Sequence, residues 1–286
     1  MPSDSLVGPG VFCIHFYLVS ENSNKNKAIG FPPPLLGDQP QRLDLLASTV
    51  TWLALNKPAG VGTRAYPWDE VPDLDGALNV QLESGKPELQ RTGAELFGSV
   101  YYLDPEISGV AVFAKDRASL ADLRNYFGSG ECRCIFHFLA ARNEEVATGF
   151  DADAPLLPHN VKPKMIPSPA KGKKSFTAFK RLAESESGWS LWEASTAFFR
   201  PHQVRAHAAT HGIPVLGDAL YNGPEAPTMR QLQPRARRSD LDSALFGGLA
   251  IHLSRVEIPV EGGTTAITSP FPKPFRLILK RLGLSF

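Results

Sequence analysis

Three short segments combine residue types that could carry chemistry. The first is Leu55-Asn56-Lys57-Pro58-Ala59-Gly60, and the second is Leu103-Asp104-Pro105-Glu106-Ile107-Ser108-Gly109. The third is Arg200-Pro201-His202-Gln203-Val204-Arg205-Ala206-His207. Each segment alone has an ordinary interpretation, since Asp104 before a proline is typical of a turn and Arg205 of a helix surface. In a closed, apolar pocket a carboxylate would tend to hold a proton, whereas a nearby guanidinium would keep it ionised and oriented.

Other common catalytic and cofactor sites are not favoured. The chain contains no GxGxxG, P-loop or GxSxG motif, so we expect no nucleotide cofactor and no ordinary serine hydrolase. His207 and His211 lie four residues apart, but no glutamate follows His207 as it does in a metalloprotease helix. The three cysteines show no zinc-ligand spacing, and we expect no metal site. A hydrolase built on His202 and Asp218 would lack an accompanying nucleophile motif.

The three segments are flanked by apolar stretches that predict regular structure. Buried or alternating patterns indicate strands at residues 52–56, 109–115, 133–140, 190–197 and 251–258. Helices are indicated from the N-cap Asp116 to Gly128, at 202–211 and at 275–282. Strands outnumber helices and do not alternate with them regularly. The sequence therefore predicts an α+β fold, built on a mixed, mainly antiparallel sheet flanked by helices.

The chain divides into two regions by composition. Residues 1–44 contain an apolar stretch at 11–19, which predicts a strand, and a polar, Pro-rich part that predicts an extended connector. Residues 45–286 contain the three segments and form the second predicted domain. The apolar stretch is short, contains His15, and has no Lys or Arg before Lys25, so it indicates neither a secretory signal nor a membrane span. We expect a cytoplasmic protein without a membrane partner.

Charge is separated along the chain although the formal net charge is only +1. Residues 154–183 contain no Asp or Glu. The basic residues in this acid-free segment are Lys162, Lys164, Lys171, Lys173, Lys174, Lys180 and Arg181. Such a segment suits a polyanion such as RNA. A solvated lysine-rich loop is the alternative interpretation.

In order and spacing, the three segments resemble the RluA-type RNA pseudouridine synthases. The resemblance runs from about Leu45 to the C-terminus and includes Gly212-Ile213-Pro214-Val215-Leu216-Gly217-Asp218, Leu220-Tyr221, Ile251-His252-Leu253 and Pro270-Phe271-Pro272. It implies the pseudouridine synthase fold and the isomerisation of uridine to pseudouridine in structured RNA, ribosomal or transfer RNA. That reaction uses no cofactor, and the resemblance leaves open whether the carboxylate attacks the base, attacks the sugar or acts as a base. We expect a monomer.

The resemblance also implies roles for individual residues. Asp104 corresponds to the catalytic carboxylate, Arg205 to its partner and Phe138 to the aromatic residue that stacks on the target base. The base must leave the RNA stack to reach the carboxylate, and stacking recovers part of that cost. Together with the acid-free segment, the resemblance predicts a set of RNA-contacting residues: Tyr102, Lys57, Arg200, His202, Gln203, Lys171, Lys173 and Lys174.

Several positions depart from the family pattern. Tyr102 stands where the family has an arginine, and Phe138 where it usually has a tyrosine. Ile107 replaces the usual threonine, and Phe198-Phe199 replaces Thr-Gly. The sequence therefore supports a second hypothesis, an RNA-binding protein with the synthase fold and little or no activity. Retention of Asp104 and Arg205 favours the enzyme.

Overall fold

The structure is a computed structural model that describes residues 28–232, 242–260 and 262–285. The predicted strand at residues 11–19 lies outside these residues. The strands are β1 Ala28–Phe31, β2 Gln41–Ser48, β3 Trp52–Lys57, β4 Gly98–Ser99, β5 Ser108–Ala114, β6 Arg133–Ala141, β7 Gly149–Ala152, β8 Leu156–Pro158, β9 Met165–Pro167, β10 Thr177–Glu184, β11 Trp189–Thr196, β12 Ile251–Val260 and β13 Gly263–Thr268. The helices are α1 Leu74–Glu83, α2 Pro87–Gln90, α3 Arg117–Ser129, α4 Gln203–Thr210, α5 Met229–Leu232 and α6 Lys273–Leu282.

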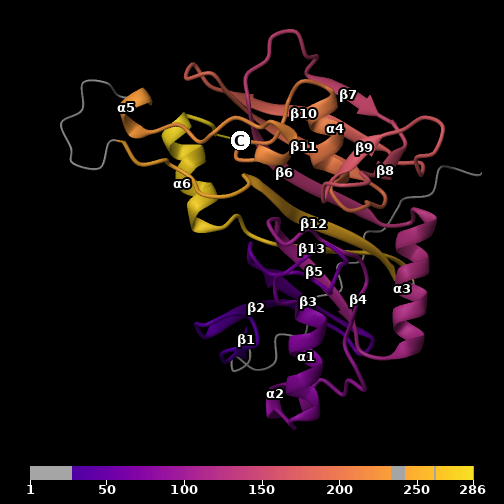
Figure 1. Ribbon diagram of the computed structural model, residues 1–286. Helices are drawn as coiled ribbons and strands as arrows, with labels where there is room; N and C mark the ends of the chain where they lie inside the picture. Colours follow the sequence, from indigo (N-terminus) through magenta and orange to yellow (C-terminus); the bar gives the residue numbers. More distant parts are fainter. Residues whose placement is uncertain (1–27, 233–241, 261, 286) are drawn as a thin grey trace, which may run out of the picture.

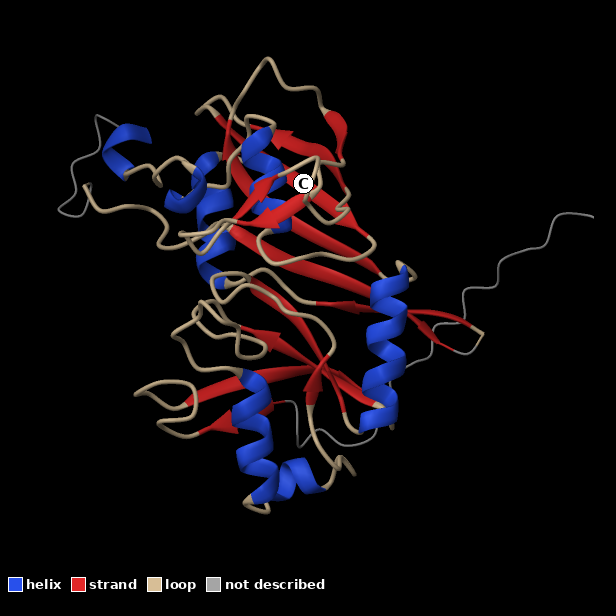
Figure 2. Ribbon diagram, turned by 45° about the vertical axis from the view of Figure 1, so that its right-hand side comes forward, coloured by secondary structure: helices blue, strands red, loops and turns tan. Residues whose placement is uncertain are grey.

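One large mixed sheet organises the molecule. Its strand order is β1-β2-β3-β5-β12-β6-β11-β10-β7, with β4 paired to β5 and β13 to β12. Neighbouring strands are antiparallel, apart from β5 and β12, which run parallel. Figures 1 and 2 show α1 and α2 beside the half of the sheet that contains β1, β2 and β3, and α4 and α6 beside the half that contains β6, β10 and β11. The predicted α+β fold with a mainly antiparallel sheet is confirmed.

The predicted elements match the structure where the local signals are strong. Asp116 caps α3, and its side chain accepts a hydrogen bond from the backbone of Ser119. This helix ends at Gly130, which has the left-handed conformation, two residues after the predicted end. In the described part of the Pro-rich connector, residues 28–31 form strand β1, because Ile29 and Phe31 alternate into a hydrophobic core with α1.

The two halves of the sheet meet where β12 crosses β5, and this crossing demands a glycine. β12 comes from the C-terminal part of the chain and pairs with β5 through Leu253 and Gly109. A Cβ atom on Gly109 would lie 2.1 Å from the carbonyl oxygen of Leu253, and the φ of Gly109 is +131°. Only glycine fits this position. The close crossing fixes β5 and the Asp104 segment that leads into it.

The helices are short. Among the described residues, no helix has the length and apolar character required to cross a membrane.

Candidate active site

Asp104 lies in the turn before β5, and its carboxylate is almost completely buried. Only 3% of the residue is exposed. Its Oδ1 accepts a hydrogen bond from the backbone N–H of His202 at 3.1 Å, and its Oδ2 accepts one from Nη1 of Arg205 at 3.1 Å. The structure thus brings together two of the segments singled out above, which lie about a hundred residues apart in the chain. Both carboxylate oxygens are fixed in position.

A second carboxylate, Asp218, holds the other edge of the Arg205 guanidinium. Nε of Arg205 donates to Asp218 at 2.7 Å and Nη2 donates to it at 3.0 Å. The bidentate partner of Arg205 is therefore Asp218, whereas the contact with Asp104 is a single hydrogen bond. Since Asp218 is fully buried, it fixes the guanidinium that faces Asp104.

The charges of this cluster follow from its contacts. Burial alone would raise the pKa of Asp104, but His202 and Arg205 more than offset this, so that the pKa lies below its usual value. Burial lowers the pKa of the His202 imidazole. The charge of Arg205 acts in the same direction, whereas the charge of Asp104 opposes the lowering. Burial opposes the charge of Arg205 too, yet hydrogen bonds to Asp218 and the charge of Asp104 raise its pKa.

His202 has an unusual backbone conformation that serves the site. It is the N-cap of α4 and has the left-handed conformation, with φ of 56°. Such a conformation is uncommon for a residue with a side chain and is found preferentially at functional sites. Here it directs the His202 N–H towards Asp104. The imidazole Nδ1 lies 3.1 Å from the hydroxyl of Tyr221, which is also hydrogen-bonded to the backbone of Met165.

Lys57 lies inside the protein, and the predicted RNA contact of this lysine stays a prediction. Its side chain is fully buried. Its Nζ donates to the carbonyl oxygens of Pro58, Val61 and Pro105, at 3.1, 2.6 and 3.0 Å. Burial lowers the pKa of Lys57 to about 7. The Asn-Lys-Pro-Ala-Gly turn is thereby tied to the carbonyl group of Pro105, the residue after Asp104.

Gln203 also proves to be internal. Its amide nitrogen donates to the carbonyl oxygen of Phe176 at 2.9 Å, and its amide oxygen accepts from the backbone of Arg200 at 3.1 Å. Only 1% of Gln203 is exposed, yet it lines the cavity beside Asp104, and its predicted RNA contact stays a prediction. Its hydrogen bonds hold the start of α4 against β10.

Arg200 links the site to the acid-free segment. It is partly exposed, lines the small cavity beside Asp104, and donates through Nε to the carbonyl oxygen of Lys174 at 3.1 Å. Lys171, Lys173 and Lys174 are all exposed. The predicted basic residues therefore lie at the surface, next to the loop that leads into α4.

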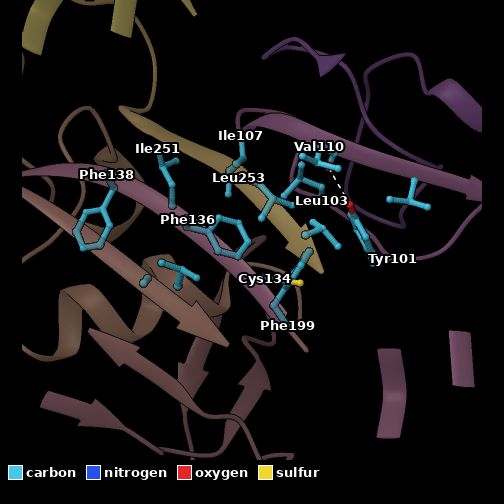
Figure 3. Close-up of a cluster of buried hydrophobic side chains, with 14 of the residues drawn as sticks. Tyr101, Leu103, Ile107, Val110, Cys134, Phe136, Phe138, Phe199, Ile251 and Leu253 are labelled. Atoms are coloured by element: carbon cyan, nitrogen blue, oxygen red, sulfur yellow. Dashed lines mark hydrogen bonds between the residues drawn. The ribbon is translucent and has the colours of Figure 1, made fainter. Parts of the chain in front are cut away.

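The aromatic residue beside Asp104 is Phe136 and not Phe138. The lining of the cavity includes Phe136, together with Leu103, Ile107 and Phe199. Phe138 instead packs in the core edge-on to Phe179, with ring centroids 6.0 Å apart. Figure 3 shows Phe136 in the middle of this cluster and Phe138 farther along β6. The two rings lie on the same face of the strand, and the predicted stacking role of Phe138 stays a prediction.

The segment 64–72, here called the aromatic loop, covers the site with aromatic side chains. The Trp68 ring lies 5.8 Å from that of His202, and Tyr66 lies 4.4 Å from Tyr102. The hydroxyl of Tyr102 donates to Asp69 at 2.7 Å. Tyr102, which we predicted to contact RNA, is therefore buried beneath this loop. The cavity beside Asp104 measures about 10 Å³.

Several residues of the site were not assigned a role by sequence analysis. Asp218 and Tyr221 lie in the quoted Gly-Asp and Leu-Tyr pairs, which could have drawn attention to them. Phe136 shares its alternation with Phe138. Trp68 and Asp69 had no sequence signal. Within the described ranges, no group of three or more His, Cys, Asp or Glu side chains could hold a metal ion.

Comparison with known proteins agrees with this geometry. The family described as RNA pseudouridylate synthase matches residues 51–210. Ribosomal large subunit pseudouridine synthase D of Neisseria meningitidis serogroup B is 26% identical, over 99% of this chain and 70% of that protein. The uncharacterized RNA pseudouridine synthase YhcT of Bacillus subtilis is 26% identical, over 80% and 69%. The solved structure of human RNA pseudouridylate synthase domain containing 4 has a similar fold, with a TM-score of 0.63, 17% identity, and coverage of 85% of this chain and 94% of that one.

Proposed function

Because the chain belongs to the RNA pseudouridylate synthase family, we propose that it isomerises uridine to pseudouridine in structured RNA, with Asp104 as the reacting carboxylate. The observation that carries this proposal is the hydrogen-bonded pair of Asp104 and Arg205 in a buried, largely apolar pocket. We expect the substrate to be ribosomal or transfer RNA. A monomer in the cytoplasm stays a prediction.

The reaction needs an ionised carboxylate at a fixed place. The N-glycosidic bond breaks, the uracil rotates, and a carbon–carbon bond forms, with no net redox change. Arg205 and the His202 amide each donate to one oxygen of Asp104. Each oxygen has a second lone pair with which to meet the nucleoside. Because the donors are preformed, the carboxylate does not have to reorganise when the substrate arrives.

The pocket suits a base that has left the RNA stack. Phe136, Phe199 and Ile107 form an apolar wall beside Asp104. An aromatic face can stack on the extruded base and recover part of the cost of unstacking. We assign this role to Phe136 in place of Phe138.

RNA binding must open the pocket, and we assign the opening to the aromatic loop. A cavity of about 10 Å³ holds roughly one water molecule, which is far too little for a uracil ring. Trp68 and Tyr66 are only partly buried and join the site through ring contacts, whereas Arg205 and His202 are held by charged or backbone hydrogen bonds. The weaker contacts are those that the arriving nucleotide displaces.

The test combines mapping and a point mutant. Pseudouridine is mapped in total RNA from cells with and without the protein, and the RNAs that differ are then offered to purified protein. Asp104→Asn should abolish isomerisation and leave RNA affinity within a few fold, since it removes no phosphate contact. Asp122→Asn, the same change at an exposed position on α3, serves as control and should be fully active.

Two outcomes would reject the proposal. Pseudouridine formation by Asp104→Asn at the wild-type rate would exclude Asp104 as the reacting group. No turnover by wild type on any RNA, with tight and salt-sensitive binding intact, would instead support an RNA-binding protein that retains only the synthase fold.

A further inference from the structure

A groove of about 400 Å³ lies between β9 and α4, apart from the cavity at Asp104. Figure 1 shows β8 and β9 beside α4. The groove shares no lining residue with the cavity at Asp104. Its volume is within the range of small-molecule sites. The residues that line it include Lys164, Met165, Ile166, Ala209, Thr210, Pro214, Tyr221 and Asn222.

The lining offers an apolar wall with polar groups at its edge. Met165, Ile166 and Pro214 present apolar surface, and Tyr221 presents an aromatic ring. Lys164 carries a positive charge, with its Nζ 5.7 Å from the centre of the Tyr221 ring. A nucleotide matches both features, because its base has apolar faces and its phosphate is anionic.

Charge complementarity favours RNA as the occupant. Lys164 belongs to the acid-free segment, residues 154–183, which contains seven basic residues and no acidic one. Polyanions are attracted to such a segment, and a phosphate next to Lys164 would release a counterion. The groove therefore lies where the backbone of a bound RNA would be held.

The groove and the active site share Tyr221 as a dividing wall. Its ring lines the groove, while its hydroxyl lies 3.1 Å from Nδ1 of His202. Nε2 of His202 lies 3.8 Å from Oδ2 of Asp104. Two side chains therefore separate the groove from the reacting carboxylate, and adjacent nucleotides of one RNA strand could occupy the two sites.

We propose that the groove between β9 and α4 binds an unpaired nucleotide next to the target uridine and so selects the sequence around that uridine. The proposal rests on the function proposed above. Enzymes that act on extruded bases commonly obtain their sequence preference from contacts to flanking nucleotides. Here the contacts would be stacking on the apolar wall and a phosphate contact with Lys164.

Methyl NMR tests binding without reference to activity. Of the two methionines in the described residues, Met165 lines the groove and Met229 lies on α5. In protein labelled with ¹³C-methyl methionine, each of the four 5′-nucleoside monophosphates is titrated in turn, with inorganic phosphate for comparison. At least one nucleotide should shift the Met165 resonance saturably and more strongly than phosphate does, while Met229 stays in place. A Met165 resonance that responds to none of the four overturns the proposal.

Variants locate the response in the groove. Lys164→Gln should weaken the nucleotide affinity by up to about fivefold, the scale of one exposed charge pair. Lys162→Gln, two residues away and outside the lining, is the matched control and should have no effect. Ala209→Phe should fill the groove and remove the Met165 response. An unchanged response in both groove variants places the nucleotide elsewhere and overturns the proposal.

An activity measurement separates this proposal from the proposed function. In a hairpin RNA that carries a mapped uridine, each flanking nucleotide is replaced singly by an abasic ribose. At one position the abasic replacement should lower kcat/KM of wild type about tenfold or more, the scale of one lost stacking contact. The same replacement should have no such effect on Ala209→Phe. Turnover without any sensitive position rejects the groove and leaves the function standing. If wild type turns over no RNA, the function fails and the Met165 titration still decides the groove.

Discussion

Neutralising Asp218 should destabilise the protein much more than neutralising an exposed partner of another arginine. In Asp218→Asn the two charged hydrogen bonds from Arg205, at 2.7 and 3.0 Å, are lost. The asparagine oxygen can accept one of them, but its amide nitrogen then faces a second N–H donor. Breaking a buried ion pair costs about 3–5 kcal/mol. At about 2–3 °C per kcal/mol for a chain of this size, the melting temperature should fall by roughly 6–15 °C.

The matched control is Asp242→Asn. Asp242 accepts from Nε and Nη2 of Arg230, the same bidentate geometry, but both side chains are exposed. This variant should keep the wild-type melting temperature, because exposed pairs contribute little. Thermal unfolding followed by circular dichroism measures all three proteins. Equal melting temperatures for wild type and Asp218→Asn would refute the view that Asp218 holds the buried guanidinium.

Four further predictions concern the loop, the basic segment, the buried lysine and the two phenylalanines. RNA should change the tryptophan emission of wild type and have little effect on that of Trp68→Phe, since Trp52, Trp189 and Trp192 are buried. An equal change of emission in both proteins would contradict a movement of the aromatic loop. Changing Lys171, Lys173 and Lys174 to Gln should reduce the slope of log affinity against log salt by up to about three phosphate contacts, whereas the same change at Lys273, Arg276 and Lys280 of α6 should not. Burial lowers the pKa of Lys57 to about 7, so above that pH the folded protein binds fewer protons than the unfolded chain. The free energy of unfolding, measured in urea, should therefore rise from pH 7 to 9 in wild type and rise less in Lys57→Met. Phe138→Tyr should cost about 1–3 kcal/mol of stability, because its hydroxyl would enter the core without a partner. Phe136→Tyr should cost less, because its hydroxyl would lie beside the polar groups of the cavity. Equal melting temperatures of the two variants would contradict this placement.

Elements with strong local signals could be predicted from the sequence. The apolar stretch of β3 and the Asp116 cap of α3 depend on residues close to one another in the chain. β1 could not be predicted, because its pairing with β2 and its contact with α1 outweigh the surrounding prolines. Helix α1 was not predicted, although its N-cap Asp73 is an ordinary start signal.

The site shows a similar division. Family resemblance predicted that Asp104 and Arg205 would meet, across about a hundred residues. It did not predict which atoms of Arg205 bind which carboxylate, because that depends on where Asp218 lies after folding. Strand alternation placed Phe136 and Phe138 on one face, yet only the position of the cavity distinguishes them. The sequence also did not show that the side chains of Lys57 and Gln203 point inwards, because the carbonyl oxygens of Pro105 and Phe176 that accept from them lie far away in the chain.

Two departures from the family pattern bear directly on the charge of Asp104. Phe199 and Ile107 stand where the family usually has a glycine and a threonine, and both line the cavity beside the carboxylate. Phe199 also packs edge-on to Phe136, with ring centroids 5.1 Å apart. Such an apolar lining raises the free energy of the ionised form, so the low pKa of Asp104 depends on its two donors. Since one of them, Arg205, is held by Asp218, a more apolar pocket makes the charge of Asp104 more dependent on a residue that does not touch it.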